Sequence, residues 1–241
     1  MSIHPGGQNI CGISIGVLAL ESYFPKPPGH IKNPSSLPFT LMYEMLDGIT
    51  VPKLLANPTG EMKERLIDAA KRLEQKGVRA ITGSCGFLAI FQKEIAAAVN
   101  IPVFVSSLVQ VPLAHQMTGR SVGVITASAN SLTPAHIDGV GAGQTPIVVQ
   151  GLDATEEFAS VILRNERTQM DLGKVEAELI AAAKGMIARH PDIGSIVLEC
   201  TDLPPYAHRL QAELNLPVFD IITLAEMVHR AVIRQPFPGF I

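Results

Sequence analysis

Two cysteines occupy equivalent places in two similar stretches of this chain. Cys85 follows the strand-like run in Arg79-Ala-Ile-Thr-Gly-Ser-Cys85-Gly86, and Cys200 does so in Gly194-Ser-Ile-Val-Leu-Glu-Cys200-Thr201. Each run is short and apolar, which is typical of a buried strand. A helical pattern follows each cysteine, and at the same spacing both copies continue with Asn-x-Pro-Val-Phe, at 100–104 and 215–219. The chain therefore contains an internal repeat with one thiol in each copy.

A thiol at the start of a helix is suited to proton transfer. The positive end of the helix dipole and the nearby backbone N–H groups lower the pKa of such a thiol. We therefore expect thiolate at Cys85 or Cys200 near neutral pH. A thiolate and a thiol on opposite faces of a bound carbon acid can remove a proton from one side and return one from the other. This arrangement predicts inversion of a stereocentre.

Strand and helix patterns alternate along the chain, which indicates parallel sheets. A buried strand is expected at 13–20, and a similar pattern restarts at 119–126. We predict an α/β fold of two similar, flavodoxin-like lobes, each a parallel sheet flanked by helices, related by a pseudo-two-fold axis. The predicted first lobe is 1–118 together with 217–241, and the second is 119–216. Because ligands of open parallel sheets bind beyond the carboxyl ends of the strands, we expect the site in the cleft between the lobes.

Small and hydroxylated residues beside the cysteines predict a place for an anion. The N–H groups that follow each cysteine, including that of Gly86, and the hydroxyls of Ser84 and Thr201 can bind a carboxylate or an enolate oxygen. Further candidate substrate contacts lie where the first strands of the two halves end: Thr126, Ser128, Glu21 and Ser22.

The segment 21–38 is dense in Pro and Gly and is too long for a plain connection. We interpret it as a candidate lid, and His30 within it as a candidate substrate contact; a surface excursion without function is the alternative. Cys11 stands apart from the repeat and is expected to be a small core residue.

Composition excludes several classes of function. The 19 basic and 22 acidic residues leave a net charge of −3, with no basic cluster that would favour nucleic acid. The N-terminus lacks the features of a signal peptide, and the apolar run 10–20 is too short to span a bilayer, so we expect a soluble, cytoplasmic protein without membrane contact. Neither Cys85 nor Cys200 has a second Cys or His at metal-ligand spacing, and no phosphate-binding loop is present. No metal or cofactor is therefore expected.

The two motifs Thr82-Gly-Ser-Cys85-Gly and Leu198-Glu-Cys200-Thr201-Asp202-Leu-Pro-Pro resemble the two cysteine motifs of the aspartate/glutamate/hydantoin racemase superfamily. The resemblance covers nearly the whole chain, including the duplication. It implies two α/β lobes, an active site between them, and cofactor-independent proton transfer by the two cysteines. It also implies that Ser84, Thr126 and Thr201 contact the substrate.

The chain departs from the amino-acid racemases of this superfamily beside its second cysteine. Those enzymes usually have His two residues after the second cysteine and Gly before it, where this chain has Asp202 and Glu199. A carboxylate next to Cys200 raises the pKa of the thiol and favours the proton-donating state. Both carboxylates are candidates for modulating the thiols, and the alternative is that they only complement a helix dipole. The first strand ends in Leu20-Glu21-Ser22 instead of the Asp-Ser-Gly glutamate signature, so the substrate stays open.

The sequence therefore predicts an isomerase, a cofactor-independent racemase or epimerase of a small carboxylate-bearing or hydantoin-like carbon acid, with proton transfer between Cys85 and Cys200. The alternatives are a decarboxylase or cis-trans isomerase of the same superfamily that uses one cysteine, and a small-molecule binding protein without chemistry. The expected partner is a small-molecule substrate. The apolar helices fit a dimer interface as well as a core, so a homodimer or a higher homo-oligomer stays open.

Overall fold

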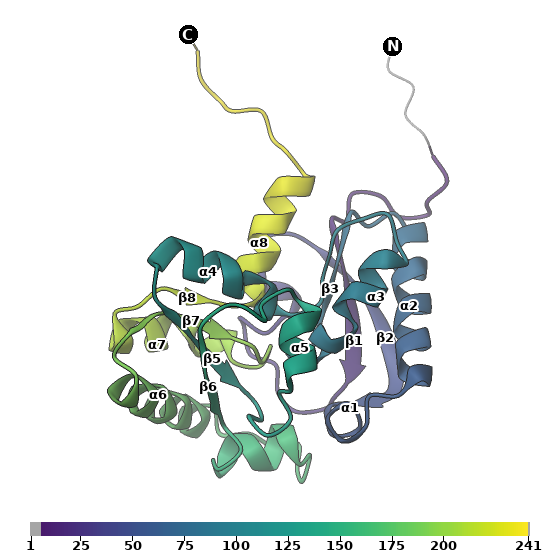
Figure 1. The fold of residues 1–241 in the computed structure, drawn as a ribbon. Helices are drawn as coiled ribbons and strands as arrows, with labels where there is room; N and C mark the ends of the chain where they lie inside the picture. Colours follow the sequence, from purple (N-terminus) through teal and green to yellow (C-terminus); the bar gives the residue numbers. More distant parts are fainter. Residues whose placement is uncertain (1–5, 241) are drawn as a thin grey trace.

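The computed structural model describes residues 6–240, and the chain forms two four-stranded parallel sheets (Figure 1). The first sheet has the strand order β2-β1-β3-β4 and the second β6-β5-β7-β8, so the two halves repeat one topology. The strands are β1 (Ile15–Glu21), β2 (Leu41–Thr50), β3 (Ala80–Gly83), β4 (Val103–Phe104), β5 (Ser121–Thr126), β6 (Ile147–Gly151), β7 (Ile193–Leu198) and β8 (Val218–Phe219). The predicted α/β class, the parallel sheets and the duplication are confirmed.

Helices flank both sheets because their apolar positions recur at helical spacing. In α2, Thr59 caps the first turn by accepting a hydrogen bond from the backbone N–H of Met62, and the buried face runs from Met62 to Leu73. The α-helices are α1 (Val51–Ala56), α2 (Gly60–Gln75), α3 (Gln92–Ala97), α4 (Val111–Thr118), α5 (Pro134–Gly139), α6 (Leu172–Arg189), α7 (Ala207–Leu214) and α8 (Ile221–Val232). Four 3₁₀ turns, η1 (Pro34–Ser36), η2 (Gly86–Phe91), η3 (Ser107–Gln110) and η5 (Pro204–Tyr206), and one π-helical turn, η4 (Ala159–Leu163), complete the described helical segments.

Several local features differ from the sequence prediction. The stretch after Cys85 begins as the 3₁₀ turn η2 and becomes α-helical only at Gln92. The long strand β2, which follows the segment 21–38, has no counterpart among the predicted elements. Cys11 is exposed before β1, so the expectation of a core cysteine is wrong.

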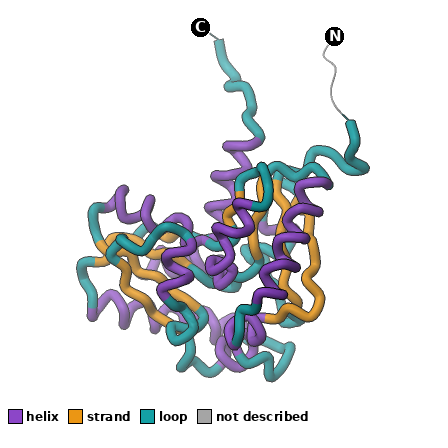
Figure 2. Tube along the Cα trace, turned by 45° about the vertical axis from the view of Figure 1, so that its right-hand side comes forward, coloured by secondary structure: helices purple, strands orange, loops and turns teal. Residues whose placement is uncertain are grey.

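One hydrophobic core extends over both sheets. It includes Leu18 and Leu20 of β1, Ile125 of β5, and Ile196 and Leu198 of β7. The two sheets stand as separate groups of strands with helices around and between them (Figure 2). The chain ends its second sheet with β8 and then returns to the first sheet, because α8 buries its apolar face against β1. The division at 118 and 217 stays a prediction.

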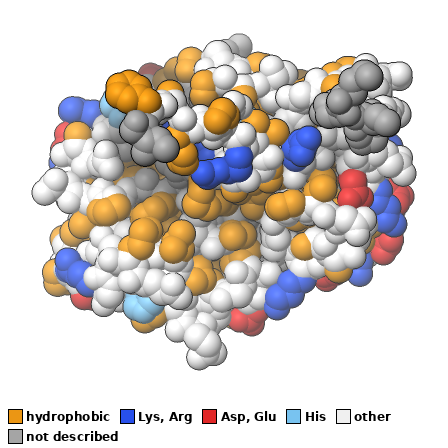
Figure 3. All heavy atoms as spheres, turned by 90° about the horizontal axis from the view of Figure 1, so that it is seen from above, with side chains coloured by type: hydrophobic (Ala, Val, Ile, Leu, Met, Phe, Trp, Pro, Cys, Tyr) orange, Lys and Arg blue, Asp and Glu red, His pale blue; other side chains and the backbone are white. Residues whose placement is uncertain are grey.

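Hydrophobic side chains are also visible on the face from which both chain ends emerge (Figure 3). α4 and α8 reach this side of the molecule (Figure 1), and Met117 of α4 and Met227 of α8 are about half exposed, at 57% and 49%. The predicted homo-oligomer stays a prediction. Along residues 6–240, none of the helices combines the length and the apolar character needed to cross a bilayer.

Candidate functional site

The carboxyl ends of β3 and β7 bring the two cysteine motifs together. Thr201 donates a hydrogen bond from its hydroxyl to the backbone carbonyl of Ser84 at 2.6 Å, so the two motifs are joined directly. The Ser84 hydroxyl accepts a hydrogen bond from the backbone N–H of Leu20 at 2.9 Å, which ties β3 to β1. Cys85 and Cys200 are each only 6% exposed. Both thiols therefore lie in one buried region where the two sheets meet.

Cys200 begins a hydrogen-bonded chain that crosses to the first lobe. Its Sγ donates to Asp202 Oδ2 at 3.3 Å, and Asp202 Oδ1 lies 2.7 Å from His30 Nε2. The backbone N–H of Lys32 donates to His30 Nδ1 at 2.8 Å, so Nδ1 carries no proton. His30 is therefore neutral and donates its Nε2 proton to Asp202. In the structure His30 binds this carboxylate, and its predicted contact with substrate stays a prediction.

The environment of the thiols corrects the prediction of an easily formed thiolate. Burial and the negative charge of Glu199 raise the pKa of Cys85, and burial together with Asp202 raises the pKa of Cys200 well above its usual value. The backbone N–H groups of Phe87 and Asp202 lower the two thiol pKa values, but burial and the carboxylates outweigh them. The sequence pattern indicates where the helices start, but it does not reveal that the folded chain buries both thiols. Burial and the neighbouring carboxylates therefore favour the thiol form of both cysteines.

Glu199 of the second motif carries a fully buried carboxyl group that lies against Gly86 of the first motif. The Thr126 hydroxyl donates to its Oε2 at 2.7 Å, whereas its Oε1 has no hydrogen-bond partner among the described residues. Burial raises the pKa of Glu199 to about 7. A Cβ atom at Gly86 would lie 2.2 Å from Oε1, so only glycine fits beside this carboxyl. Gly86 and Thr126 thus lie against the Glu199 carboxyl.

The segment 21–38, predicted as a lid, is docked over the site. Gly29 has φ +101°, and a Cβ there would come within 2.7 Å of Pro205 Cα in η5 of the second lobe. His30 is 2% exposed, and the Tyr43 hydroxyl donates to the Ile31 carbonyl at 2.9 Å. This segment of the first lobe therefore contacts η5 of the second lobe at Gly29 and is tied to β2 of its own lobe at Ile31.

Two further residues of this region were missed by the sequence analysis. Lys32 places its ammonium at the end of β1, where Nζ donates to the Leu20 carbonyl at 2.7 Å and to Ser22 Oγ at 2.5 Å. Tyr206 is 5% exposed, its hydroxyl has no partner within residues 6–240, and burial and Asp202 raise its pKa. Lys32 lies two residues after His30, but a lone lysine in a Pro-rich loop carries no signal for a site.

Among the described hydrogen bonds, the remaining predicted residues have none to either thiol. Glu21 accepts hydrogen bonds from the Tyr23 hydroxyl and the Gly48 backbone, and Ser128 donates to Asp153. Glu21 and Ser22 line a small cavity of about 100 Å³ that also includes Ile162 and Asn165 of the second lobe. Ser22 connects this cavity to Lys32 through its hydroxyl. Ser128 is held in its own lobe by Asp153.

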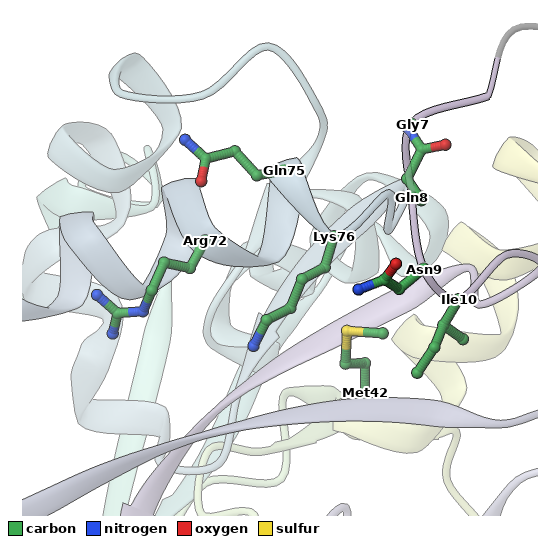
Figure 4. Close-up of a pocket in the computed structure, with 8 residues that line it drawn as sticks. All are labelled: Gly7, Gln8, Asn9, Ile10, Met42, Arg72, Gln75 and Lys76. Carbon is green, nitrogen blue, oxygen red and sulfur yellow. The ribbon is translucent and has the colours of Figure 1, made fainter.

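A larger groove of about 610 Å³ lies elsewhere, between α2, β2 and residues 7–10 (Figure 4). Arg72 and Lys76, which line it, both pair with Glu44, at 2.7 and 2.6 Å. None of the residues predicted for the site lines this groove. Over the described part of the chain, no group of three His, Cys, Asp or Glu residues is placed to hold a metal ion.

Comparison with known proteins identifies the family. Residues 109–226 match the family model described as Asp/Glu/Hydantoin racemase. A dimethylsulfoniopropionate lyase of Durusdinium sp. clade D is 32% identical over 95% of this chain and 78% of its own length. Dimethylsulfoniopropionate lyase 5 of Emiliania huxleyi (strain CCMP1516) is 31% identical over 94% of this chain, which spans only 47% of that protein.

Solved structures agree with the fold. A cysteine variant of arylmalonate decarboxylase superposes with a TM-score of 0.64 at 17% identity, covering 94% of this chain and 97% of that one. An aspartate racemase homologue from Pyrococcus horikoshii gives a TM-score of 0.55 at 20% identity over 89% of this chain and 98% of that one. At these identities the likeness shows the fold alone.

These relatives overturn the predicted activity. The relatives at about 30% identity are lyases, so the prediction of an isomerase that racemises a carbon acid is wrong. They agree better with the alternative of a superfamily member that uses one cysteine, since the decarboxylase named there is also a lyase. The resemblance that the motifs suggested is correct. The chain belongs to the aspartate/glutamate/hydantoin racemase superfamily, in a group of relatives that are named dimethylsulfoniopropionate lyases.

Proposed function

We propose that the protein is a lyase that cleaves dimethylsulfoniopropionate by β-elimination. The observation that carries this proposal is the 32% identity to the Durusdinium lyase over 95% of this chain. The substrate named for that enzyme has a carboxylate at one end and a sulfonium at the other. Its cleavage without water removes a proton from C2, forms the C2–C3 double bond, and breaks the C3–S bond with the electron pair leaving on sulfur. The products are acrylate, dimethyl sulfide and a proton.

The arrangement around Cys200 suits removal of the C2 proton. In the proposed step the Cys200 sulfur takes that proton while its own thiol proton passes to Asp202, 3.3 Å away. His30 holds the carboxylate in place through its Nε2–H. A bound sulfonium cation lowers the pKa of the thiol, because it offsets the negative charge of Asp202 and Glu199. The raised pKa of the Cys200 thiol is therefore compatible with its use as a base in the substrate complex.

Cys85 has a different role in this proposal. Its burial and the Glu199 charge keep the thiol protonated. A protonated thiol donates a weak hydrogen bond and does not compete with Cys200 for the C2 proton. Cys200 is then the base of the elimination and Cys85 a hydrogen-bond donor. Racemisation would instead require both cysteines to exchange protons with the substrate.

The test is product formation by the purified protein. With dimethylsulfoniopropionate we expect dimethyl sulfide in the headspace by gas chromatography and the vinyl protons of acrylate by NMR. Cys200→Ala should lower the rate by about 10³-fold, the usual scale of a lost general base. Cys11→Ala is the matched control, because Cys11 is exposed and should leave the rate unchanged. A folded wild-type protein that releases no dimethyl sulfide, or a Cys200→Ala variant with full rate, would contradict the proposal.

A further inference from the structure

Lys32 brings a positive charge to the buried end of β1. Its Nζ donates to the Leu20 carbonyl and to Ser22 Oγ, which occupies two of the three N–H donors of an ammonium group. Both acceptors are neutral. Within residues 6–240 no carboxylate forms an ion pair with Lys32 at the distances seen for the other pairs of the molecule. The ammonium therefore has one donor and its charge left without a partner.

The charge of Lys32 interacts with groups of the thiol region. Burial and the charge of Lys26 lower the pKa of its ammonium to about 8, while Asp202 and Cys85 act in the opposite direction. The main chain of the same residue also belongs to the site, since its N–H fixes the tautomer of His30. Lys26, by comparison, directs its ammonium at the Ser22 and Phe24 carbonyls of its own segment.

A partly buried ammonium that has no carboxylate of residues 6–240 within hydrogen-bonding distance favours a ligand that supplies the opposite charge. We propose that Lys32 binds the carboxylate of the substrate and so selects carboxylate-bearing sulfonium compounds, an inference that rests on the proposed lyase function. The zwitterionic substrate then matches the site at both ends, with its carboxylate on Lys32 and its sulfonium towards the acidic side chains Asp202 and Glu199.

The same contact assists the chemistry. Removal of the C2 proton moves a second negative charge onto the carboxylate oxygens of the substrate. An ammonium already hydrogen-bonded to these oxygens stabilises that charge more than the charge of the ground state. Lys32 therefore acts as a positioning and charge-stabilising group, and its removal should raise KM and lower kcat.

The experiment compares Lys32→Met and Lys32→Arg with Lys53→Met, a control that removes an exposed lysine from α1. Loss of a hydrogen bond to a charged group corresponds to roughly 10- to 100-fold, which we expect as the rise in KM for Lys32→Met. Lys32→Arg should show a smaller rise in KM than Lys32→Met, and Lys53→Met should have the KM of the wild type. Propionate, which has the carboxylate alone, should inhibit the wild type and lose its effect on Lys32→Met. Trimethylsulfonium, which has only the cation, should inhibit both equally.

Other results separate this inference from the proposed function. If the wild type releases no dimethyl sulfide, the lyase proposal fails. The role of Lys32 can then still be tested by calorimetry, which compares propionate binding by the wild type and by Lys32→Met. An unchanged KM and unchanged propionate inhibition in folded Lys32→Met, or no propionate binding by the wild type, would overturn the role of Lys32. Lys32→Gln, which keeps a hydrogen-bonding group for Leu20 and Ser22, replaces Lys32→Met if that variant does not fold.

Discussion

Asp202 has two opposing effects on the Cys200 thiol. The carboxylate raises the pKa of the thiol by its charge, and it is also the acceptor of the thiol proton. A carboxylate in this position makes the free thiol less acidic and at the same time supplies the group that receives its proton. The two effects can be separated by removing the charge while keeping the shape of the side chain.

Asp202→Asn should therefore make Cys200 more reactive to alkylation and less active in elimination. We expect the pKa of Cys200, measured by iodoacetamide alkylation against pH, to fall, because the negative neighbour is lost. The elimination rate should fall by about 10²-fold or more, the scale of an acid–base contribution. A Cys11→Ala background removes the exposed thiol from the alkylation signal. A fall in the pKa of Cys200 together with a rise in the elimination rate would show that Asp202 only suppresses the thiol.

Glu199 predicts how stability depends on pH. Burial raises its pKa from 4.5 to about 7, so the folded state holds a proton between these values that the unfolded chain has lost. The contribution of Glu199 to stability is fully present below pH 4.5 and is lost as pH rises through 7. A shift of this size corresponds to about 3 kcal/mol.

Glu199→Gln should accordingly flatten this part of the pH profile. In urea unfolding at pH 5 and pH 8, the variant should gain stability relative to the wild type at the higher pH. Glu64→Gln, on the exposed face of α2, is the matched control. If the difference between Glu199→Gln and the wild type were the same at both pH values, Glu199 would not be the group that titrates.

At the scale of elements, the segment 21–38 decides whether the site is complete. It supplies His30 and Lys32, and it is held against the second lobe by the close approach of Gly29 to Pro205. Ser36 supports the same turn, since its hydroxyl donates to the His30 carbonyl at 2.7 Å and accepts from the Gly29 N–H at 2.9 Å. The position of two site residues thus depends on one glycine contact.

Gly29→Ala should lower activity more than it lowers stability. The new methyl group meets Pro205 backbone at 2.7 Å, so the segment must shift and carry His30 and Lys32 with it. Gly48→Ala is a matched control, because Gly48 also has positive φ, at +73°, with nothing within 4 Å of the added Cβ. Both variants share the backbone strain, on the order of 1 kcal/mol. Only Gly29→Ala should raise KM; equal kinetics in the two variants would mean that the contact does not position the site.

Helices and strands could be predicted from the sequence where a short stretch of residues determines them. The apolar run before Cys85 and its copy before Cys200 identified β3 and β7, and the repeat identified the two-lobed fold. The 3₁₀ geometry of η2 and the exposure of Cys11 depend on packing that the pattern does not contain. The raised thiol pKa values and the place of Lys32 arise from contacts between distant parts of the chain, so they appear only in the folded structure.

At the scale of the whole molecule, the two lobes share one hydrophobic core, and they are linked by α8, which follows the second sheet in the chain and packs on the first. The main core cluster includes residues of β1 and β3 in the first sheet and of β5 and β7 in the second. α8 leaves the second sheet after β8 and covers the first, where Leu224 is 2% exposed and packs in a cluster with Ile15 and Val17 of β1. Asp220 caps this helix by accepting hydrogen bonds from the Ile222 and Thr223 N–H groups.

Neither lobe therefore has a complete core without the other, and we expect one cooperative unfolding transition. Leu224→Ala should lower the free energy of unfolding by about 3 kcal/mol, as for other buried leucines, and should shift the whole transition. Met227→Ala on the same helix is the matched control, since Met227 is 49% exposed and its loss should have little effect. Calorimetry and urea unfolding followed by circular dichroism measure both variants. Two separate transitions, with only one of them moved by Leu224→Ala, would mean that the first lobe folds independently of the second and that α8 stabilises its own sheet alone.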